Sequence, residues 1–158
     1  MSFNKKFNDM KNSVLLSVAI LTLSAFNLLA QDIMRSEVPP AILNNFEQEF
    51  ASARDVEWEK EGALYKVDFE HKRRIDMEVW YSGDGNVVRQ EEEWRKSNLP
   101  EMVIQVIKSE YPDHKIEDVK KITENGQVQF KLDLDARQQP DLNIWVGEDG
   151  RILRSERD

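Results

Sequence analysis

The chain has 158 residues, of which 33% are charged and 9% aromatic, a composition typical of a folded polar protein. Its formal charge of −8 argues against nucleic acid or an anionic membrane as the main partner, because both favour a basic surface. It contains no cysteine, which excludes thiol chemistry, disulfides and Cys-based metal sites. The length suits one ordinary domain, or two very small ones that share a core.

The first thirty residues form a separate segment. Three lysines, at positions 5, 6 and 11, precede the uncharged stretch NSVLLSVAILTLSAFNLLAQ. This order predicts a signal peptide at residues 1–30, cleaved after Ala30, and a periplasmic or secreted chain with a charge of −10. The alternative is a retained membrane anchor, since the stretch is just long enough to span a bilayer. Its Ser, Thr and Asn residues favour removal.

The first half of the remaining chain, residues 37–95, predicts one helix and four strands. A proline pair opens the helix, and apolar residues then recur every four positions at Ile42, Phe46 and Phe50. The period changes to two in ALYKVDFE, which is typical of a half-buried strand, and VEWEK, IDMEVWY and VVRQEEE supply the other three. Trp58 alternates with Val56 in VEWEK and is expected in the core.

The second half, residues 98–158, follows the same plan. Pro100 opens a helix that carries Val103, Ile107 and Tyr111 at a spacing of four. The segments IEDVKKI, VQFKLDLD, DLNIWV and ILRSER then predict four strands. The connection EEWRKSNL contains Trp94, for which the pattern leaves both packing and exposure open.

The two halves are related by an offset of 65 residues. From Lys66 to Glu91, eight residues are identical to their counterparts at this offset, among them Trp80 with Trp145 and Arg89 with Arg154. The sequence therefore predicts an α+β fold in which a helix plus four-stranded antiparallel unit is duplicated in tandem. Two units side by side can form one continuous sheet with both helices on one face, and the other face stays open to solvent.

The order of these motifs resembles a known family. A proline, an amphipathic helix ending in Phe or Tyr, V-x-W, G-x-x-Y-x-V-x-F, D-x-x-V-x-Y/W and D-G-x-V/I follow one another through residues 37–158. This order is similar to that of the PepSY-like, β-lactamase-inhibitor-like proteins, which are small exported bacterial proteins. The resemblance implies a curved sheet, like that of the β-lactamase inhibitory protein, and the family has no established activity or catalytic residues to carry over to this chain. The chain lacks the cysteines of that inhibitor, so β-lactamase inhibition is not implied.

Strand parity places two tryptophans on the polar face of the predicted sheet. In IDMEVWY, Trp80 shares its face with Asp76 and Glu78, and Trp145 is placed in the same way in DLNIWV. Asp84-Gly85 and its counterpart in the second half favour two-residue hairpin loops, which would set each tryptophan opposite an arginine. Cross-strand neighbours are about 5 Å apart, close enough for a cation–π contact.

Eight residues are therefore the candidate site. We expect them to form a docking surface for a protein or peptide of the cell envelope, because Trp and Arg dominate protein interfaces. The alternative is structural, with Trp–Arg pairs that only stiffen an exposed sheet. The candidate residues are Lys66, Asp68, Trp80, Arg89, Lys131, Asp133, Trp145 and Arg154.

Signals for chemistry are few. His71 and His114 are isolated, and SGDGN lacks the ligand spacing of a calcium loop, so we expect no metal and no cofactor. Glu91, Glu92 and Glu93 are interpreted as a solvated acidic strand end rather than as catalytic carboxylates. A non-catalytic binding protein is the leading hypothesis, a small-molecule binder with an apolar groove between the halves is the alternative, and a hydrolase ranks third.

Overall fold

One antiparallel sheet of nine strands forms the body of the protein in a computed structural model, which describes residues 30–72 and 74–158. The strands lie side by side in the order of the sequence. They are β1 (Gln31–Ile33), β2 (Arg54–Glu61), β3 (Leu64–His71), β4 (Ile75–Tyr81), β5 (Val87–Glu93), β6 (Lys115–Glu124), β7 (Gln127–Asp135), β8 (Leu142–Gly147) and β9 (Ile152–Arg157).

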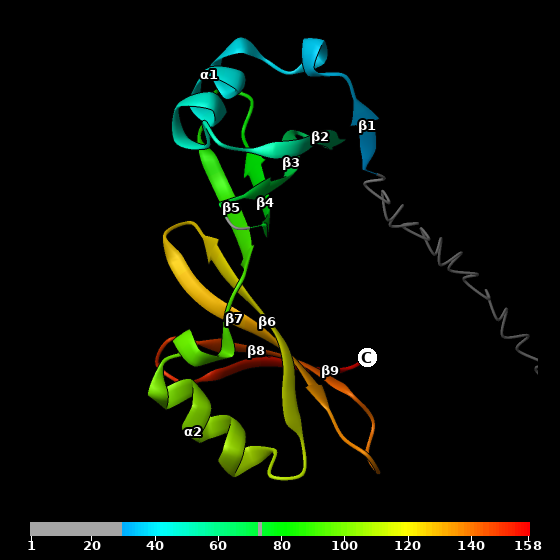
Figure 1. The fold of residues 1–158 in the computed structure, drawn as a ribbon, viewed down its shortest axis with the longest axis vertical. Coiled ribbons are helices and arrows are strands. Elements are labelled where there is room, and N and C mark those ends of the chain that lie inside the picture. The colour runs from blue at the N-terminus through cyan, green and yellow to red at the C-terminus, as the bar shows by residue number, and fades with distance from the viewer. Residues whose placement is uncertain (1–29, 73) are drawn as a thin grey trace, which may run out of the picture.

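Two helices interrupt the series of strands. Helix α1 (Pro40–Glu49) precedes β2 and helix α2 (Glu101–Glu110) precedes β6, and each follows a short 3-10 turn, at Arg35–Glu37 and Lys96–Asn98. The helices lie at opposite ends of the long axis of the molecule (Figure 1). Each begins just after or at a proline, whose fixed φ suits the first helical turn.

The predicted repeat is confirmed, because α1 with β2–β5 and α2 with β6–β9 have the same element order. The prediction of eight strands was one too few. The additional strand β1 pairs with β2 at the edge of the sheet, with Ile33 opposite Trp58. A segment of three residues is too short to show an alternating pattern, so no periodicity indicates this strand. The signal peptide predicted at 1–30 lies outside the described residues except for Ala30.

Both helices cover the same face of the sheet, as predicted. The strand register places Met77, Glu92, Lys121, Phe130 and Val146 in one lateral row, from β4 to β8. Met77 packs in the core beneath α1, whereas Phe130 and Val146 pack in the core beneath α2. The opposite face of the sheet carries no helix among the described residues.

The two cores differ in composition. The first is aromatic, with Phe46 in edge contact with both Trp58 and Phe69 at centroid distances of 5.3 and 5.0 Å. The second is mainly aliphatic and includes Val103, Ile107 and residues of β6–β8. Between the cores, Gln90 and Glu92 of β5 and Lys121 and Thr123 of β6 form a polar region on the helix side, where Lys121 pairs with Glu92 at 3.2 Å. Continuity of the sheet therefore joins the repeats more than shared apolar packing does.

No helix of the described part of the chain has the length and apolar character that a membrane crossing requires.

Candidate functional site

The open face of the sheet carries the same three side chains in each repeat. In the first, Lys66 on β3 and Arg89 on β5 lie directly opposite Trp80 on β4. In the second, Lys131 on β7 and Arg154 on β9 lie opposite Trp145 on β8. We call each set a Lys–Trp–Arg triplet. The predicted pairing of each tryptophan with an arginine is confirmed, and the lysines complete the row.

Each indole is flanked by two cations. The Arg89 guanidinium carbon lies 5.3 Å from the Trp80 ring centroid, and Lys66 Nζ lies 5.5 Å from it. The corresponding distances to Trp145 are 4.7 Å from Arg154 and 5.7 Å from Lys131. Both indoles are half-buried, so part of each ring stays in contact with solvent. These distances are in the range of cation–π attraction.

The hairpins that set this register differ from the predicted ones. Gly85 N donates to Ser82 O, Ser82 N donates to Asn86 O, and only Gly85 has a positive φ, which defines a three-residue loop. Tyr81 then pairs with Val87 but Trp80 pairs with Arg89, so Val88 is the extra residue of a β-bulge.

The longer loop and the bulge shift the register in opposite directions. The predicted partner of Trp80 is therefore right although the predicted loop is wrong. The same compensation occurs in the second repeat, where Val146 pairs with Ile152 and Trp145 with Arg154. A two-residue loop with positive φ at both positions is found instead at Asn125-Gly126, between β6 and β7.

The hairpin tips are fixed to the helices. Asn45 of α1 donates from Nδ2 to Gly85 O at 2.9 Å, and a Cβ on Gly85 would lie 3.3 Å from the backbone of Ala41. A Cβ on Gly150 would lie 3.0 Å from Met102 O of α2. Each tryptophan therefore lies on a hairpin whose tip is packed closely against its own helix, and in the first repeat a hydrogen bond joins the two.

A network of ion pairs surrounds the first triplet. Lys66 Nζ lies 3.0 Å from Asp68, 3.2 Å from Glu78 and 3.9 Å from Glu59. Arg89 pairs with Glu91 and, at 3.7 Å, with Glu124. The cations beside Trp80 are thus held by carboxylates rather than free in solvent.

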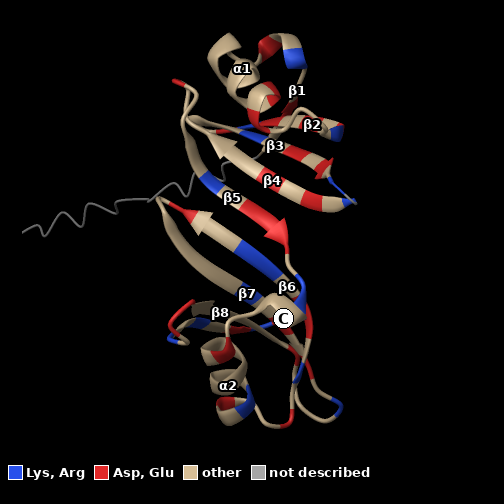
Figure 2. Cartoon of the chain, turned by 60° about the vertical axis from the view of Figure 1, so that its left-hand side comes forward, with Lys and Arg blue, Asp and Glu red and all other residues tan. Residues whose placement is uncertain are grey.

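Lys120 of β6 extends this network across the junction of the repeats. Its Nζ lies 2.7 Å from Glu78 Oε1 and 3.8 Å from Glu91 Oε2. Figure 2 shows basic residues on β6 beside acidic residues on β5. Ile122 of β6 lies in the same lateral row as Glu91 and is only 1% exposed, so the charged side chains enclose an apolar residue on the open face.

The pKa values of this network reflect burial and pairing. For Lys66, burial favours the neutral amine, but the hydrogen bond to Asp68 and the charge of Glu78 outweigh it and raise the pKa. For Glu78, burial is likewise outweighed by Lys120, and the pKa of Glu78 is lowered. Burial raises the pKa of Asp68, and Lys66 only partly offsets this because Glu78 and Glu57 are close. These shifts favour charged Lys66 and Glu78 at neutral pH.

The second triplet has fewer ionic partners. Lys131 Nζ lies 3.2 Å from Asp133 Oδ1, without the geometry of a hydrogen bond, and Arg154 pairs with Glu156. Asn143 occupies the position that corresponds to Glu78 of the first repeat. All eight predicted residues therefore lie on the open face, in two clusters. Glu78, Glu91 and Lys120 were missed, because no local pattern indicates which charges meet across the junction.

The other two tryptophans belong to the interior or to the connection. Trp58 is 5% exposed and packs in the first core, as expected, whereas Val56 is 38% exposed. A bulge between Arg54 and Glu57, with Asp55 at a positive φ, separates the two residues. Trp94 packs on the second core, donates from Nε1 to Asn98 O at 3.2 Å, and lies beneath Lys121.

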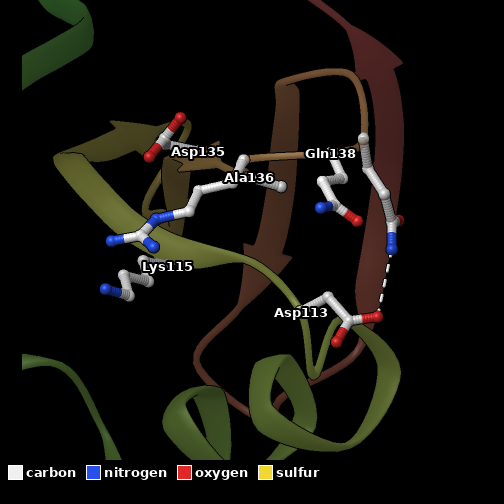
Figure 3. Close-up of a pocket in the computed structure, with 7 residues that line it drawn as sticks. Asp113, Lys115, Asp135, Ala136 and Gln138 are labelled. Atoms are coloured by element: carbon white, nitrogen blue, oxygen red, sulfur yellow. Dashed lines mark hydrogen bonds between the residues drawn. The ribbon is translucent and has the colours of Figure 1, made fainter.

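Several surface hollows among the described residues are open, and most of the residues that line them are polar. One of about 550 Å³ lies between the turn after α2 and the loop after β7, where Gln139 donates to Asp113 at 3.0 Å (Figure 3). A smaller one of about 190 Å³ at the junction is lined mainly by carboxylates, including Asp76 and Glu93. None of these hollows is the deep apolar groove between the halves that the small-molecule hypothesis requires.

Residues 30–72 and 74–158 also hold no group of His, Asp and Glu side chains suited to a metal ion. His71 packs edge-on against Phe50 at a centroid distance of 5.5 Å, and its Nδ1 lies 3.4 Å from Ser52 Oγ. His114 Nε2 lies 3.2 Å from Pro140 O. Both histidines therefore have structural contacts at the ends of strands, away from the triplets.

These features define a class of structure, a tandem helix-on-sheet fold in which the other face of the sheet is charged and carries no helix among the described residues. The sequence model of the family described as "Putative beta-lactamase-inhibitor-like, PepSY-like" matches residues 27–89 and again residues 76–154. The chain belongs to this family, and the predicted family and tandem repeat are confirmed.

Solved structures from Bacteroides species share the fold. A DUF2874 family protein from Bacteroides uniformis is 20% identical, with a TM-score of 0.65 over 75% of this chain and 88% of that one. A protein from Bacteroides eggerthii, called a putative periplasmic protein, is 19% identical, with a TM-score of 0.67 over 76% of this chain and 88% of that one. A BLIP-like protein from Bacteroides fragilis is 22% identical, with a TM-score of 0.61 over 74% of this chain and 84% of that one. No curated protein matches the chain.

Proposed function

We propose that the protein is a non-catalytic binding module of the cell envelope that docks a protein or peptide on the open face of its sheet. The observation that carries this proposal is the duplicated Lys–Trp–Arg triplet. Two half-buried indoles on the polar side of a sheet are unusual, because the large apolar ring of tryptophan is highly buried on average. Tryptophan and arginine are also enriched among the residues that dominate binding energy at protein interfaces.

The arrangement suits recognition because it is held in place before a partner arrives. The cations on either side restrict each indole, and carboxylates restrict the cations around Trp80. A side chain that is already ordered loses little conformational entropy on binding. The ions around each ring provide a polar rim, and the ring itself provides the apolar contact.

A place in the envelope is supported by two separate features. The positively charged start followed by an apolar stretch is typical of an export signal. A protein of the same fold is called a putative periplasmic protein. The absence of catalysis is part of this proposal, and it is supported by the few sequence signals for chemistry and by surface hollows that are open and lined mainly by polar residues.

Affinity capture from an envelope extract tests the proposal. The wild-type chain is used as bait beside the double variant Trp80→Ala/Trp145→Ala, and Met102→Ala serves as a control because Met102 is an exposed apolar residue of α2. We expect a partner that is retained by the wild type and by the control and lost by the double variant. If the folded double variant retains every captured protein, the open face is not the docking surface.

A further inference from the structure

Strand β9 ends the sheet with a free edge in the described part of the chain. Five of its six residues, Leu153–Arg157, are exposed. The other edge is formed by β1, which has only three residues, and very short edge strands are a known protection against pairing. We infer that β9 pairs antiparallel with β9 of a second copy of this chain, across a two-fold axis at Ser155, so that the two sheets join into one.

The first repeat already shows how this strand receives a neighbour. Strand β5 is the counterpart of β9 at the offset of 65 residues, and its outer edge is occupied by β6 in antiparallel register. Arg89 of β5 lies opposite Glu124 of β6, with 3.7 Å between Nη1 and Oε2. The corresponding Arg154 of β9 would meet a carboxylate in the same way, supplied by the second copy.

The hydrogen bonds of β9 determine which residues can pair outward. Asp158 N donates to Asp141 O at 3.0 Å, and in an antiparallel ladder the bonded pairs alternate. Glu156 and Arg154 therefore direct their backbone groups toward β8, whereas Ser155 and Arg157 direct theirs outward. Strand β5 shows the same alternation, because Trp94 N donates to Val119 O at 2.8 Å. The residues of β5 that bond to β6 are therefore the counterparts of the outward-directed residues of β9.

Because inward and outward hydrogen bonds alternate along β9, three two-fold registers are possible near the middle of the strand. They differ in which charged residues lie opposite each other. An axis at Arg154 sets two arginines opposite each other, and an axis at Glu156 sets two glutamates opposite each other. An axis at Ser155 sets Arg154 of each copy opposite Glu156 of the other. Like charges directly opposite destabilise a pair of strands and unlike charges stabilise it. The axis at Glu156 would also set Arg154 opposite Asp158 of the other copy, but only the axis at Ser155 sets unlike charges opposite each other without a like-charge pair.

The side chains needed for this contact are available. Arg154 and Glu156 have side chains that are 60% and 43% exposed, although they pair with each other within the chain. Leu153, an exposed apolar residue, would lie opposite Arg157 of the second copy and could be covered by its aliphatic stem. The contact uses the edge of the sheet and leaves the indole of Trp145 on the open face.

Molecular mass in solution tests the inference first. The chain, produced with its own N-terminal segment and purified, is measured by sedimentation equilibrium up to about 100 μM. We expect a dimer whose dissociation constant lies within this range. A chain that remains monomeric throughout the range overturns the inference.

Charge-swap variants then test the register. Arg154→Glu alone and Glu156→Arg alone would each face like charges in a homodimer, and we expect each to weaken self-association about tenfold or more. Mixed in equal amounts, the two variants regain two Arg–Glu contacts and should form a heterodimer. Arg151→Glu, which alters the loop outside the pairing, is the control and should dimerise like the wild type. Single variants that dimerise normally, or a mixture that stays monomeric, would contradict the register.

A proline at the axis provides a test that does not depend on charge. The N–H of Ser155 points away from β8, so Ser155→Pro keeps the bonds to β8 and removes two bonds from the dimer. Circular dichroism should show that this variant is folded, while its self-association is lost. A Ser155→Pro chain that dimerises as tightly as the wild type would place the interface elsewhere.

Discussion

Lys120 Nζ lies 2.7 Å from Glu78 Oε1, and this ion pair joins the second repeat to the first. Glu78 is also 3.2 Å from Lys66, so it lies between one lysine of each repeat. Asn143, its counterpart, has no charge to play the same part. The two repeats are therefore similar but not identical, and Glu78 contributes an ion pair at their junction that Asn143 in its place could not make.

Removal of the Lys120 charge should weaken the junction. Lys120→Met keeps most of the side-chain length and leaves Glu78 with one cation fewer, and we expect the free energy of unfolding to fall by about 1 kcal/mol because the pair is partly exposed. Lys115→Met, at an exposed position of the same strand, is the control and should be within about 0.5 kcal/mol of the wild type. Urea unfolding measures both, and equal losses would show that the junction pair adds nothing.

The lowered pKa of Glu78 predicts how stability responds to acid. A carboxyl group whose pKa is lower in the folded than in the unfolded chain stabilises the fold above its ordinary value of 4.5, and this contribution disappears as pH falls through the folded pKa. Glu78→Gln should therefore be less stable than the wild type at neutral pH, and the difference should shrink toward about pH 3.

The pKa of Asp68 is shifted in the opposite direction to that of Glu78, so the two groups should affect stability oppositely as pH changes. Its raised pKa means that protonation favours the folded chain, so stability from this group is lost as pH rises through its folded pKa. Asp68→Asn should gain stability relative to the wild type as pH rises over the same interval. Denaturant midpoints measured at several pH values give both curves, and parallel curves for the two variants would contradict the assignment.

The hairpin glycines provide a matched pair of substitutions. Gly85 has a φ of +92°, and a Cβ there would lie 3.0 Å from Asn45 Nδ2 and 3.3 Å from the Ala41 backbone. Gly83 has no atom within 4 Å of such a Cβ. We expect Gly85→Ala to lower the free energy of unfolding by about 2 kcal/mol, from backbone strain plus displacement of α1, and Gly83→Ala to be nearly neutral. Similar midpoints for the two variants would show that the tip does not bear on the helix.

Much of the fold was predictable because periodicity is a local property. The alternation of Val67 and Phe69 with Lys66 and Asp68 identified the strand and its two faces, and the duplication placed both helices on one side. Side-chain parity likewise put Trp80 and Trp145 on the open face. These inferences depend only on the period of two, which the backbone fixes without reference to distant residues.

What the sequence did not reveal depends on small or distant features. The loop that ends at Gly85 and the bulge at Val88 each shift the register by one residue, and their cancellation could not be read from Asp-Gly alone. Strand β1 depends on an edge that only tertiary structure creates. The enclosure of Ile122 by charged neighbours also requires β5 and β6 to meet, and they are separated in sequence by helix α2.

The two triplet tryptophans should differ in their importance for stability. Trp80 donates from Nε1 to Glu61 Oε2 at 2.9 Å, whereas Gly126 occupies the corresponding position beside Trp145 and has no side chain to accept. Trp80 is also surrounded by the larger ion network. We therefore expect Trp80→Ala to lower the free energy of unfolding by about 2–3 kcal/mol and Trp145→Ala by about 1 kcal/mol.

This difference bears on whether the indoles bind a partner or only stiffen the sheet. If stiffening is their sole purpose, Trp145→Ala should leave partner capture by the folded chain unchanged, whatever stability it costs. If Trp145 is retained for binding, its loss should leave thermal unfolding close to the wild type and still reduce partner capture. Thermal denaturation beside the capture experiment decides between them, and Trp145→Phe shows whether any aromatic ring suffices.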